Sequence, residues 1–386
     1  MKKLTILGST GSIGQQTLAV VDEFSLAFQV VALSCHKDIV RFENQVRKYN
    51  PKFAVITDEA TYHRSESLRL SYPKTKFLLG REGLLEIVSL EEVDTVVVAI
   101  VGNEALLPTI KAIEAKKRIC IANKEVLVTS GHLIMPLVLE HKVELIPVDS
   151  EHSALFQCLQ GNKQKSIEKV VLTASGGPFR GLKRSDLVDV KASRALKHPN
   201  WEMGRKISID SATMMNKGLE VIEAKWLFDL ALDQIDVVVH PQSIVHSMVQ
   251  YKDSSIIAQM GLPDMRLPIL YALNYPNRMQ SSFERIDFKK LMTLDFEAPD
   301  YETFPCLGLA YEVLKNGGIQ STILNAANEV LVERYLSDEI GFYDIPKGIE
   351  WAIGRYTNIF NPDLQTILEQ DLDTRNLMID WNPNQR

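Results

Sequence analysis

Two acidic residues stand close together after an apolar run in the first half of the chain. The run Val143–Val148 leads into Asp149-Ser150-Glu151, and if the chain stays extended there, both carboxylates project to the same side. Carboxylate oxygens, completed by water and substrate oxygens, are the ligands that Mg²⁺ and Mn²⁺ prefer. Such a pair is also common in a solvated turn, so its interpretation depends on the rest of the chain.

A second polar group lies in the N-K-G-L-E segment that starts at Asn216. The sequence predicts a long helix over Ala212–Leu230, on which Asn216 and Lys217 precede Glu220 by four and three residues and share a face with it. A Lys–Glu pair at this spacing is usually a surface ion pair. The helix is preceded, however, by the polar loop His198–Gly204, whose histidine and tryptophan no core requires.

A glycine-rich loop near the N-terminus suggests a nucleotide site. Residues Gly8–Gly14 read G-S-T-G-S-I-G, follow the apolar run Leu4–Leu7 and precede an amphipathic helix predicted over Gln15–Phe24. Backbone N–H groups of such a loop, together with the helix N-terminus, favour a pyrophosphate. The G-x-x-G-x-x-G spacing also fits an ordinary strand-to-helix turn, but its place in the first β–α unit favours dinucleotide binding.

The end of the second apolar run bears on the choice of cofactor. An NAD enzyme places an acidic residue there to hold the ribose 2′-hydroxyl. This chain has His36-Lys37-Asp38 instead, and Lys37 with His36 could neutralise a 2′-phosphate, which predicts NADPH rather than NADH. Asp38 argues in the other direction, and Lys37 could also be a solvated loop lysine.

The elements that position these residues alternate between strands and helices. Six runs rich in Val and Ile are separated by amphipathic segments, which predicts an α/β fold with an N-terminal Rossmann-like, doubly wound parallel sheet. The runs are Leu4–Leu7, Gln29–Leu33, Phe53–Thr57, Thr95–Val101, Arg118–Ala122 and Val143–Val148.

The rhythm changes after Asp149. Alternating runs at Val237–His240 and Ile244–Tyr251 with the long helix predict an α+β second domain, and the pattern from Phe304 onward is helical. We predict an NADPH-binding domain at 1–149, a catalytic α+β domain at 150–286 with a lid near 197–206, a linker at 287–300 and a C-terminal helical domain at 301–386.

Composition excludes several classes of protein. The chain has 386 residues, 45% hydrophobic and 24% charged, and a net charge of −6, which argues against a disordered chain and against a nucleic-acid partner. The longest apolar stretch is far below the ~20 residues of a membrane span, and the N-terminus lacks the pattern of a signal peptide. We therefore expect a cytoplasmic protein with no membrane partner. Cys35, Cys120, Cys158 and Cys306 form no C-x-x-C pair, so neither disulfides nor a zinc site is predicted.

Taken in order, these motifs resemble the 1-deoxy-D-xylulose 5-phosphate reductoisomerase family of the non-mevalonate isoprenoid pathway over essentially the full length. The matching segments are G-S-T-G-S-I-G at Gly8, A-N-K-E at Ala122, V-D-S-E-H at Val148, S-G-G-P-F at Ser175, H-P-N-W-x-M-G at His198, N-K-G-L-E at Asn216, H-P-Q-S-I-V-H at His240 and P-D-M-R at Pro263. One departure stands beside the expected 2′-phosphate, where family members often have Gly-Lys-Asn and this chain has His36-Lys37-Asp38.

The resemblance implies a metal-dependent enzyme. The family isomerises a five-carbon ketose phosphate, 1-deoxy-D-xylulose 5-phosphate, to a branched aldehyde and reduces it with NADPH to 2-C-methyl-D-erythritol 4-phosphate. One divalent ion, Mg²⁺ or Mn²⁺, takes part, and by resemblance its ligands are Asp149, Glu151 and Glu220. Such an ion polarises a carbonyl and stabilises the charge that develops on its oxygen. A homodimer is also implied.

The remaining site residues carry over by resemblance as well. Donors for the substrate phosphate are Ser175, Ser211, Asn216 and Lys217; Lys124 and Ser150 face the substrate hydroxyls, and His198 and Trp201 act as a lid that expels water. On the cofactor side, Thr10, Gly11, Ser12 and Ile13 line the phosphates, Lys37 reads the 2′-phosphate, and Asn123, Glu125, Gly204 and Met265 lie near the ribose and nicotinamide.

Two other functions remain open from the sequence. A homoserine- or semialdehyde-dehydrogenase-like NADPH oxidoreductase would share the nucleotide fold without a catalytic metal, and the carboxylate triad argues against it. A nucleotide-sensing regulator would bind NADPH and a protein partner, but it has no use for the Asn216–Lys217–Glu220 face.

Overall fold

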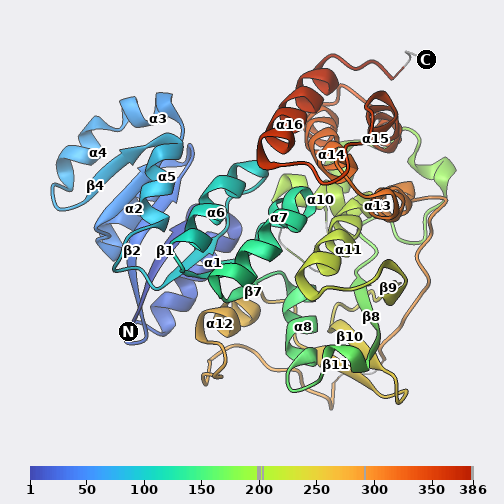
Figure 1. Cartoon of the computed structure of the whole chain (residues 1–386), viewed down its shortest axis with the longest axis horizontal. Helices are drawn as coiled ribbons and strands as arrows, with labels where there is room; N and C mark the ends of the chain where they lie inside the picture. The colour runs from blue at the N-terminus through green and yellow to red at the C-terminus, as the bar shows by residue number, and fades with distance from the viewer. Residues whose placement is uncertain (198–200, 202–203, 291–292, 384–386) are drawn as a thin grey trace. The chain divides into compact units, whose positions relative to one another are not determined.

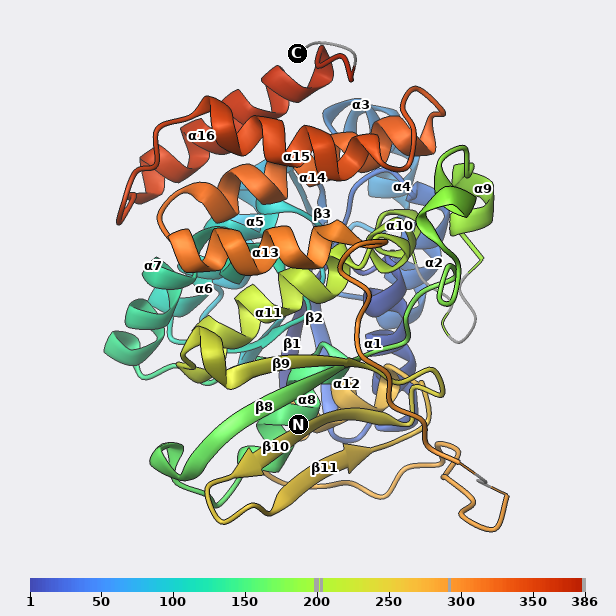
Figure 2. The same ribbon diagram turned by 90° about the vertical axis from the view of Figure 1, so that its right-hand side faces the viewer.

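A computed structural model describes residues 1–386 except 198–200, 202–203, 291–292 and 384–386 (Figures 1 and 2). The chain divides into two units. Unit 1 comprises Met1–Val126, Ile134–Ser153 and Asp264–Glu284. Unit 2 comprises Leu127–Leu133, Ala154–Pro263 and Arg285–Arg386. The domain boundaries given above stay a prediction.

Unit 1 is built on a seven-stranded parallel sheet, which confirms the predicted doubly wound α/β fold. The strand order is β4-β3-β2-β1-β5-β6-β7. The strands are β1 (Lys2–Leu7), β2 (Phe28–Cys35), β3 (Phe53–Ile56), β4 (Lys76–Leu79), β5 (Thr95–Val98), β6 (Arg118–Ile121) and β7 (Leu145–Pro147). The helices of this unit are α1 (Ser12–Glu23), α2 (Ile39–Tyr49), α3 (Glu59–Arg64), α4 (Glu66–Ser71), α5 (Gly80–Val88), η1 (Asn103–Ala105), α6 (Leu106–Glu114) and α12 (Arg266–Asn274). Helices α7 (Glu125–His141) and α8 (Ser150–Leu159) are divided between the two units, because Leu127–Leu133 and the residues from Ala154 onward belong to unit 2.

Burial explains why six of the seven strands of this sheet were predicted from the sequence and the seventh, β4, was not. All four side chains of the central strand β5 and the last four of β1 are buried, as strands covered by helices on both faces require. Strand β4 lies at the sheet edge, and its four residues are only half-buried or exposed. Its K-F-L-L sequence lacks the β-branched residues that marked the other runs.

Unit 2 combines a four-stranded sheet with a stack of helices. The sheet order is β11-β10-β8-β9, with β8 (Ile167–Ala174), β9 (Ile235–Val239), β10 (Val245–Tyr251) and β11 (Ile256–Met260). In Figure 2, α11 lies between this sheet and α13, and the remaining C-terminal helices follow beyond. The helices are η2 (Gln164–Ser166), η3 (Arg184–Leu187), α9 (Ala192–Ala195), α10 (Arg205–Ala212), α11 (Met215–Phe228), η4 (Leu232–Gln234), α13 (Pro305–Asn316), α14 (Gln320–Leu336), α15 (Asp344–Arg355) and α16 (Leu364–Ile379).

The helix expected over Ala212–Leu230 is present as α11, but it begins only at Met215, because Met214 takes a left-handed conformation with φ of 64° between α10 and α11. A second local expectation was wrong. Asp149 and Glu151 do not continue an extended strand, since helix α8 begins at Ser150, shortly after β7. Glu151 therefore lies in the first turn of a helix, where its negative charge is favoured.

Helix α11 packs very closely against α13. An added Cβ at Gly218 would lie 2.6 Å from the Cβ of Ala310 on α13. Only a residue without a side chain permits this approach. The glycine of the N-K-G-L-E segment is therefore explained by helix packing, and this packing holds in place the helix that carries Glu220.

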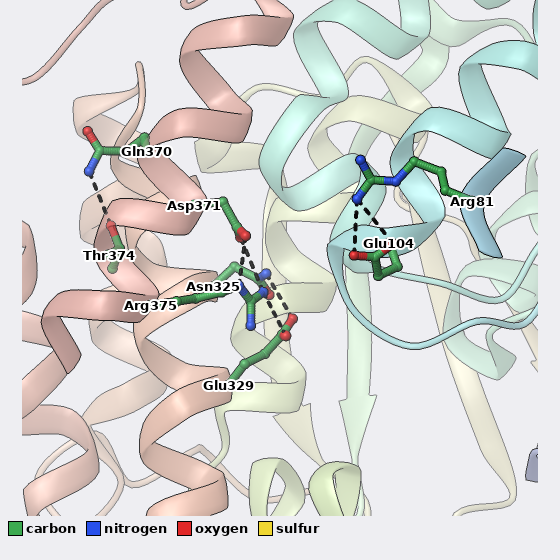
Figure 3. A network of polar contacts seen from close by, with 8 residues as sticks. All are labelled: Arg81, Glu104, Asn325, Glu329, Gln370, Asp371, Thr374 and Arg375. Carbon is green, nitrogen blue, oxygen red and sulfur yellow. Dashed lines mark hydrogen bonds and ion pairs between the residues drawn. The ribbon is translucent and has the colours of Figure 1, made fainter. Parts of the chain in front are cut away.

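Polar contacts tie the C-terminal helices together. Arg375 on α16 pairs with Asp371 one turn earlier, at 2.7 Å from its Nε, and with Glu329 of α14, at 2.8 Å from its Nη2 (Figure 3). Asn325 Nδ2 donates to the other oxygen of Glu329 at 3.0 Å. Each oxygen of Glu329 thus has a partner, and the network joins α14 to α16.

The four cysteines are all buried and unpaired. Burial raises the pKa of each thiol, to about 12 for Cys120 and Cys306 and to about 11 for Cys158. These thiols therefore pack in the interior of the protein as neutral groups. Among the described residues, no helix is long and apolar enough to cross a membrane.

The contact at Gly218 predicts an unusual response to alanine. Gly218→Ala raises helix propensity, yet it should lower the free energy of unfolding by about 1–3 kcal/mol because the new methyl group forces α11 and α13 apart. Gly354→Ala on α15 is the matched control, since nothing lies within 4 Å of its added Cβ, and it should be neutral or stabilising by up to about 1 kcal/mol. Urea unfolding of both variants checks this, and equal stability of the two would contradict the packing argument.

Candidate active site

The glycine loop lies between β1 and α1, at the carboxyl end of a central strand. Gly8 has φ of +79°, and a Cβ there would lie 2.6 Å from the carbonyl oxygen of Ala99, directly after β5. Gly11 is the N-cap of α1, and α1 has neither a side-chain cap nor an acidic residue in its first turn. The loop from Thr10 to Ile13 therefore offers an uncapped helix N-terminus to an anion.

Two residues outside the motif hold this loop. Ser34 at the end of β2 accepts the Gly8 N–H at its Oγ, at 2.9 Å, and the Ser9 N–H at its carbonyl oxygen, at 2.8 Å. Gln45 on α2 donates from Nε2 to the Ser9 carbonyl oxygen at 2.8 Å, and its Oε1 accepts from Ser9 Oγ at 2.7 Å. Gln45 was not predicted as a site residue. The only feature of the sequence that could have indicated it is a polar side chain on the buried face of an amphipathic helix.

The segment after β2 holds the residues that bear on the cofactor. Asp38 is the N-cap of α2 and accepts from the Arg41 N–H at 3.1 Å. Lys37 is exposed, and its Nζ lies 3.9 Å from Asp58. Because Asp38 serves to begin a helix, the acidic residue that argued against NADPH has a structural explanation.

The ends of β6 and β7 bring a cluster of predicted site residues together. Lys124 pairs with Asp149, and both side chains are only 10% exposed. Asp149 and Glu151 offer carboxylate oxygens within 4.8 Å of each other, and Ser150 Oγ donates to Glu151 at 2.5 Å. Since β6 and β7 are neighbours, this side of the sheet holds two carboxylates, a hydroxyl and an ammonium group.

Two residues beside Lys124 belong to the same loop. The Asn123 amide donates to the carbonyl oxygens of Ile100 and Gly102 at 2.8 and 2.9 Å, and its Oδ1 accepts from the Val126 N–H at 2.8 Å. Its side chain thus ties the loop after β6 to the loop after β5. Glu125 is the first residue of α7 and is buried.

In unit 2, α11 carries a buried polar group. Glu220 is 1% exposed and Lys217 is 3% exposed. Asn216 Nδ2 donates to Glu220 Oε1 at 2.5 Å, and the Lys217 ammonium pairs with Oε2 of the same carboxylate. The pair is therefore not a solvated surface ion pair. Burying two charges is costly, so this position points to a function.

Two serines of unit 2 lie close to this helix in the fold. Gly177 donates its N–H to Ser175 Oγ at 3.1 Å, and a Cβ on Gly177, whose φ is +66°, would lie 2.5 Å from the carbonyl oxygen of Ser211. The loop after β8 therefore packs directly on the end of α10. Asp210 anchors that end, because it accepts from Asn328 Nδ2 of α14 at 2.8 Å and pairs with Lys206 at 3.0 Å.

Four predicted residues remain to be placed. One of them, His198, lies outside the described residues. Trp201 is half-buried, with its ring centroid 6.2 Å from that of His246 on β10. Gly204 is the N-cap of α10 in unit 2, and Met265 is the N-cap of α12 in unit 1.

The predicted residues thus form two groups, one in each unit. Unit 1 holds the glycine loop, Lys37, the Asn123–Glu125 loop, Asp149–Glu151 and Met265, and unit 2 holds Ser175, Trp201, Gly204, Ser211 and the α11 residues. The predicted metal ligands are divided between the units. Asp210 was visible in the sequence beside Ser211, but its role as an anchor depends on Asn328, more than a hundred residues away.

Comparison with known proteins identifies the family. A family model described as 1-deoxy-D-xylulose 5-phosphate reductoisomerase matches residues 4–131, its C-terminal domain model matches 145–228, and a DXP reductoisomerase C-terminal domain model matches 260–377. The 1-deoxy-D-xylulose 5-phosphate reductoisomerase of Caldanaerobacter subterraneus subsp. tengcongensis is 52% identical over 97% of this chain and 98% of its own length. That of Clostridium botulinum is 50% identical over the same shares.

Solved structures agree with these matches. The Zymomonas mobilis reductoisomerase in complex with NADPH is 41% identical and superimposes with a TM-score of 0.90 over 98% of both chains. A DOX-P reductoisomerase in complex with NADPH, fosmidomycin and magnesium is 39% identical, with a TM-score of 0.94 over 98% of this chain and 97% of that one. The resemblance of the motifs is therefore confirmed, and this chain belongs to the 1-deoxy-D-xylulose 5-phosphate reductoisomerase family.

Proposed function

We propose that this chain is the enzyme that rearranges 1-deoxy-D-xylulose 5-phosphate and reduces the product with NADPH to 2-C-methyl-D-erythritol 4-phosphate, with one divalent ion, Mg²⁺ or Mn²⁺. Relatives at 50% and 52% identity are named 1-deoxy-D-xylulose 5-phosphate reductoisomerase, and a related structure holds NADPH and magnesium. The observation in this chain that carries the proposal is the buried Lys217–Glu220 pair, with the half-buried Asn216 donating to the same carboxylate. A simple dehydrogenase on the same nucleotide fold, or a nucleotide sensor, does not need it.

Asp149, Glu151 and Glu220 are proposed to hold the ion. Their hard oxygen atoms suit Mg²⁺ or Mn²⁺ better than the imidazole of His152, which lies within 4.8 Å of Asp149. When bound, the ion would polarise the substrate carbonyl and stabilise negative charge on its oxygen. Lys124 pairs with Asp149, and Lys217 pairs with Glu220.

Other residues of unit 2 are proposed to bind the substrate phosphate. Ser175 and Ser211 supply hydroxyl groups, and Asn216 and Lys217 supply an amide and an ammonium group. Charge-assisted hydrogen bonds of this kind bind phosphate strongly. Because the Ser175 loop packs on Ser211, and Ser211 is joined to α11 by a short turn, these donors converge within one unit. Lys124 and Ser150 are proposed to orient the substrate hydroxyls.

The cofactor is proposed to lie along the carboxyl ends of the unit 1 strands. The N–H groups from Thr10 to Ile13 would bind its pyrophosphate, and Lys37 would contact the 2′-phosphate. The Asn123–Glu125 loop, Gly204 and Met265 would lie near the ribose and nicotinamide. The Asn123 side chain already satisfies three backbone groups, so its contribution would come through the loop that it holds.

Substrate closure is assigned to the segment around His198 and Trp201. Excluding water protects the intermediate aldehyde and strengthens electrostatic interactions inside the site. Trp201 supplies one large apolar surface in an otherwise polar segment. We also place the enzyme in the cytoplasm, where reducing conditions suit four unpaired thiols.

The reaction itself is tested by following NADPH oxidation with 1-deoxy-D-xylulose 5-phosphate, with and without EDTA. Turnover that EDTA abolishes and Mg²⁺ or Mn²⁺ restores is expected. Metal-independent reduction of a semialdehyde would favour the dehydrogenase function instead. NADPH binding without turnover of any sugar phosphate would favour the nucleotide sensor.

Glu220→Gln should lower kcat by orders of magnitude and weaken the apparent affinity for Mg²⁺, because the variant keeps the size and an oxygen acceptor but removes a ligand charge. NADPH binding should be unchanged, since Glu220 is not among the residues proposed to bind the cofactor. Steady-state kinetics over a Mg²⁺ titration check this, with the exposed Glu312→Gln on α13 as control. Near-normal turnover at low Mg²⁺ would remove Glu220 from the ligand set.

Trp201→Phe should abolish a change in tryptophan fluorescence on substrate binding and raise KM. The indole would pass from a half-buried position beside His246 to a drier one when the lid closes. Trp351→Phe, a residue that packs against Trp381 in the C-terminal helices, is the control and should keep the response. An unaltered response and unaltered kinetics in Trp201→Phe would show that this segment is not a lid.

A homodimer is proposed to form through the outer edge of β11. This strand lies at the edge of its sheet, and Ile256 and Ile257 are 57% and 42% exposed, which leaves an apolar edge that could pair with a second chain. Ile257→Lys should shift the mass measured by light scattering from dimer to monomer. Leu372→Lys, at an exposed leucine of α16, should leave it unchanged. A dimer that survives Ile257→Lys would place the interface elsewhere.

A further inference from the structure

The first turn of α2 presents a guanidinium group to the glycine loop. Arg41 Nη1 donates to the Thr10 carbonyl oxygen at 3.0 Å and lies 2.9 Å from Asp38 Oδ2. Its side chain is 49% exposed. Arg41 thus connects two loops, the one after β1 and the one after β2, that are far apart in the sequence.

The position of Arg41, in contact with both loops, indicates which ligand group it could bind. In doubly wound dinucleotide folds the glycine loop holds the pyrophosphate, and the residues at the end of the second strand read the 2′ position of the adenosine ribose. A group that touches both loops therefore lies where a 2′-phosphate would lie. An arginine nearby is the usual means of accommodating that phosphate.

Lys37 alone is a weak reader of the phosphate. It is 68% exposed and lies 3.9 Å from Asp58, and hydrogen bonds from Thr61 hold the Asp58 carboxylate at 2.9 and 2.6 Å. These bonds lower the pKa of Asp58, which stays charged and competes for Lys37. An ammonium group is also a point charge, whereas a guanidinium group presents two parallel donors to a phosphate.

We propose that Arg41 binds the 2′-phosphate of NADPH and sets the preference of this enzyme for NADPH over NADH. One oxygen of Asp38 contacts the guanidinium group, while its other oxygen caps α2. On binding, the phosphate replaces Asp38 as the partner of Arg41, and Lys37 adds a second positive charge. This inference rests on the proposed use of NADPH.

The test measures dissociation constants of NADPH and NADH, by nucleotide fluorescence, for the full-length protein and its variants. Arg41→Met should weaken NADPH binding about tenfold to a hundredfold, as expected for loss of a charge-assisted contact, and change NADH binding less than about threefold. Arg47→Met removes the same charge from the exposed, far end of α2 and should leave both constants unchanged.

Variants of Asp38 provide an independent test in the same binding experiment. Asp38→Asn keeps a side chain that caps helices well but removes the competing charge, so NADPH should bind several-fold more tightly and NADH equally well. In the double variant Arg41→Met/Asp38→Asn, NADPH binding should still be weaker than in Asp38→Asn alone. This comparison separates a direct contact from simple exposure of the Asp38 carboxylate.

Three results would overturn the inference. Equal loss of both cofactors in Arg41→Met would mean that Arg41 only supports the Thr10 loop, unchanged NADPH binding would mean that it has no part in the site, and equal NADPH binding in the double variant and Asp38→Asn would assign the effect to Asp38. In each case normal turnover with NADPH by the unaltered protein would leave the proposed function intact. A protein that binds NADH better than NADPH would instead refute the proposed cofactor.

Discussion

Glu220 is a carboxylate with almost no exposed surface, and much of unit 2 can be understood from the need to keep it charged and fixed. A buried charge needs partners close by, and Asn216 and Lys217 supply them from the preceding turn of the same helix. That arrangement holds only if α11 cannot shift. The contact between Gly218 and Ala310 holds α11 against α13 on one side, and the sheet formed by β8 and β9 supports it on the other.

In unit 1, a sheet instead of a helix positions the acidic residues. The carboxyl ends of β6 and β7 bring Lys124 beside Asp149, and the short connection into α8 places Ser150 and Glu151 next to them. In both units, therefore, a lysine accompanies an acidic group that the proposed function assigns to the metal. Each of these two carboxylates thus has an ammonium group as its partner within its own unit.

The parallel sheet could be predicted from the sequence because its inner strands are buried on both faces and so appear as continuous runs of Val and Ile. Strand β11 could not, since its exposed residues follow no burial pattern. The break before α11 was missed for a different reason. Met214 is a common helix former, and its left-handed conformation is set by the packing of α10 and α11 and not by its own preference.

The candidate site, too, was predicted only in part from the sequence. Residue types and spacing, with the family resemblance, were enough to select Asp149, Glu151, Lys217 and Glu220. Contacts between distant segments were not accessible, because Gln45 and Arg41 reach the glycine loop only after α2 has packed beside it. The sequence pointed to Lys37 because it stands at an expected position, whereas Arg41 stands four residues further along and acts through tertiary structure.

The burial of all four cysteines has a practical consequence. Thiol reagents and oxidants attack the thiolate, and a buried thiol with a raised pKa forms very little of it near neutral pH. A cysteine introduced on the surface would therefore be the dominant reactive sulfur in the folded protein. Spin labels or fluorescent dyes could be attached at single chosen positions, such as one in each unit, without first removing the natural cysteines, and distances between the two units could then be followed in solution.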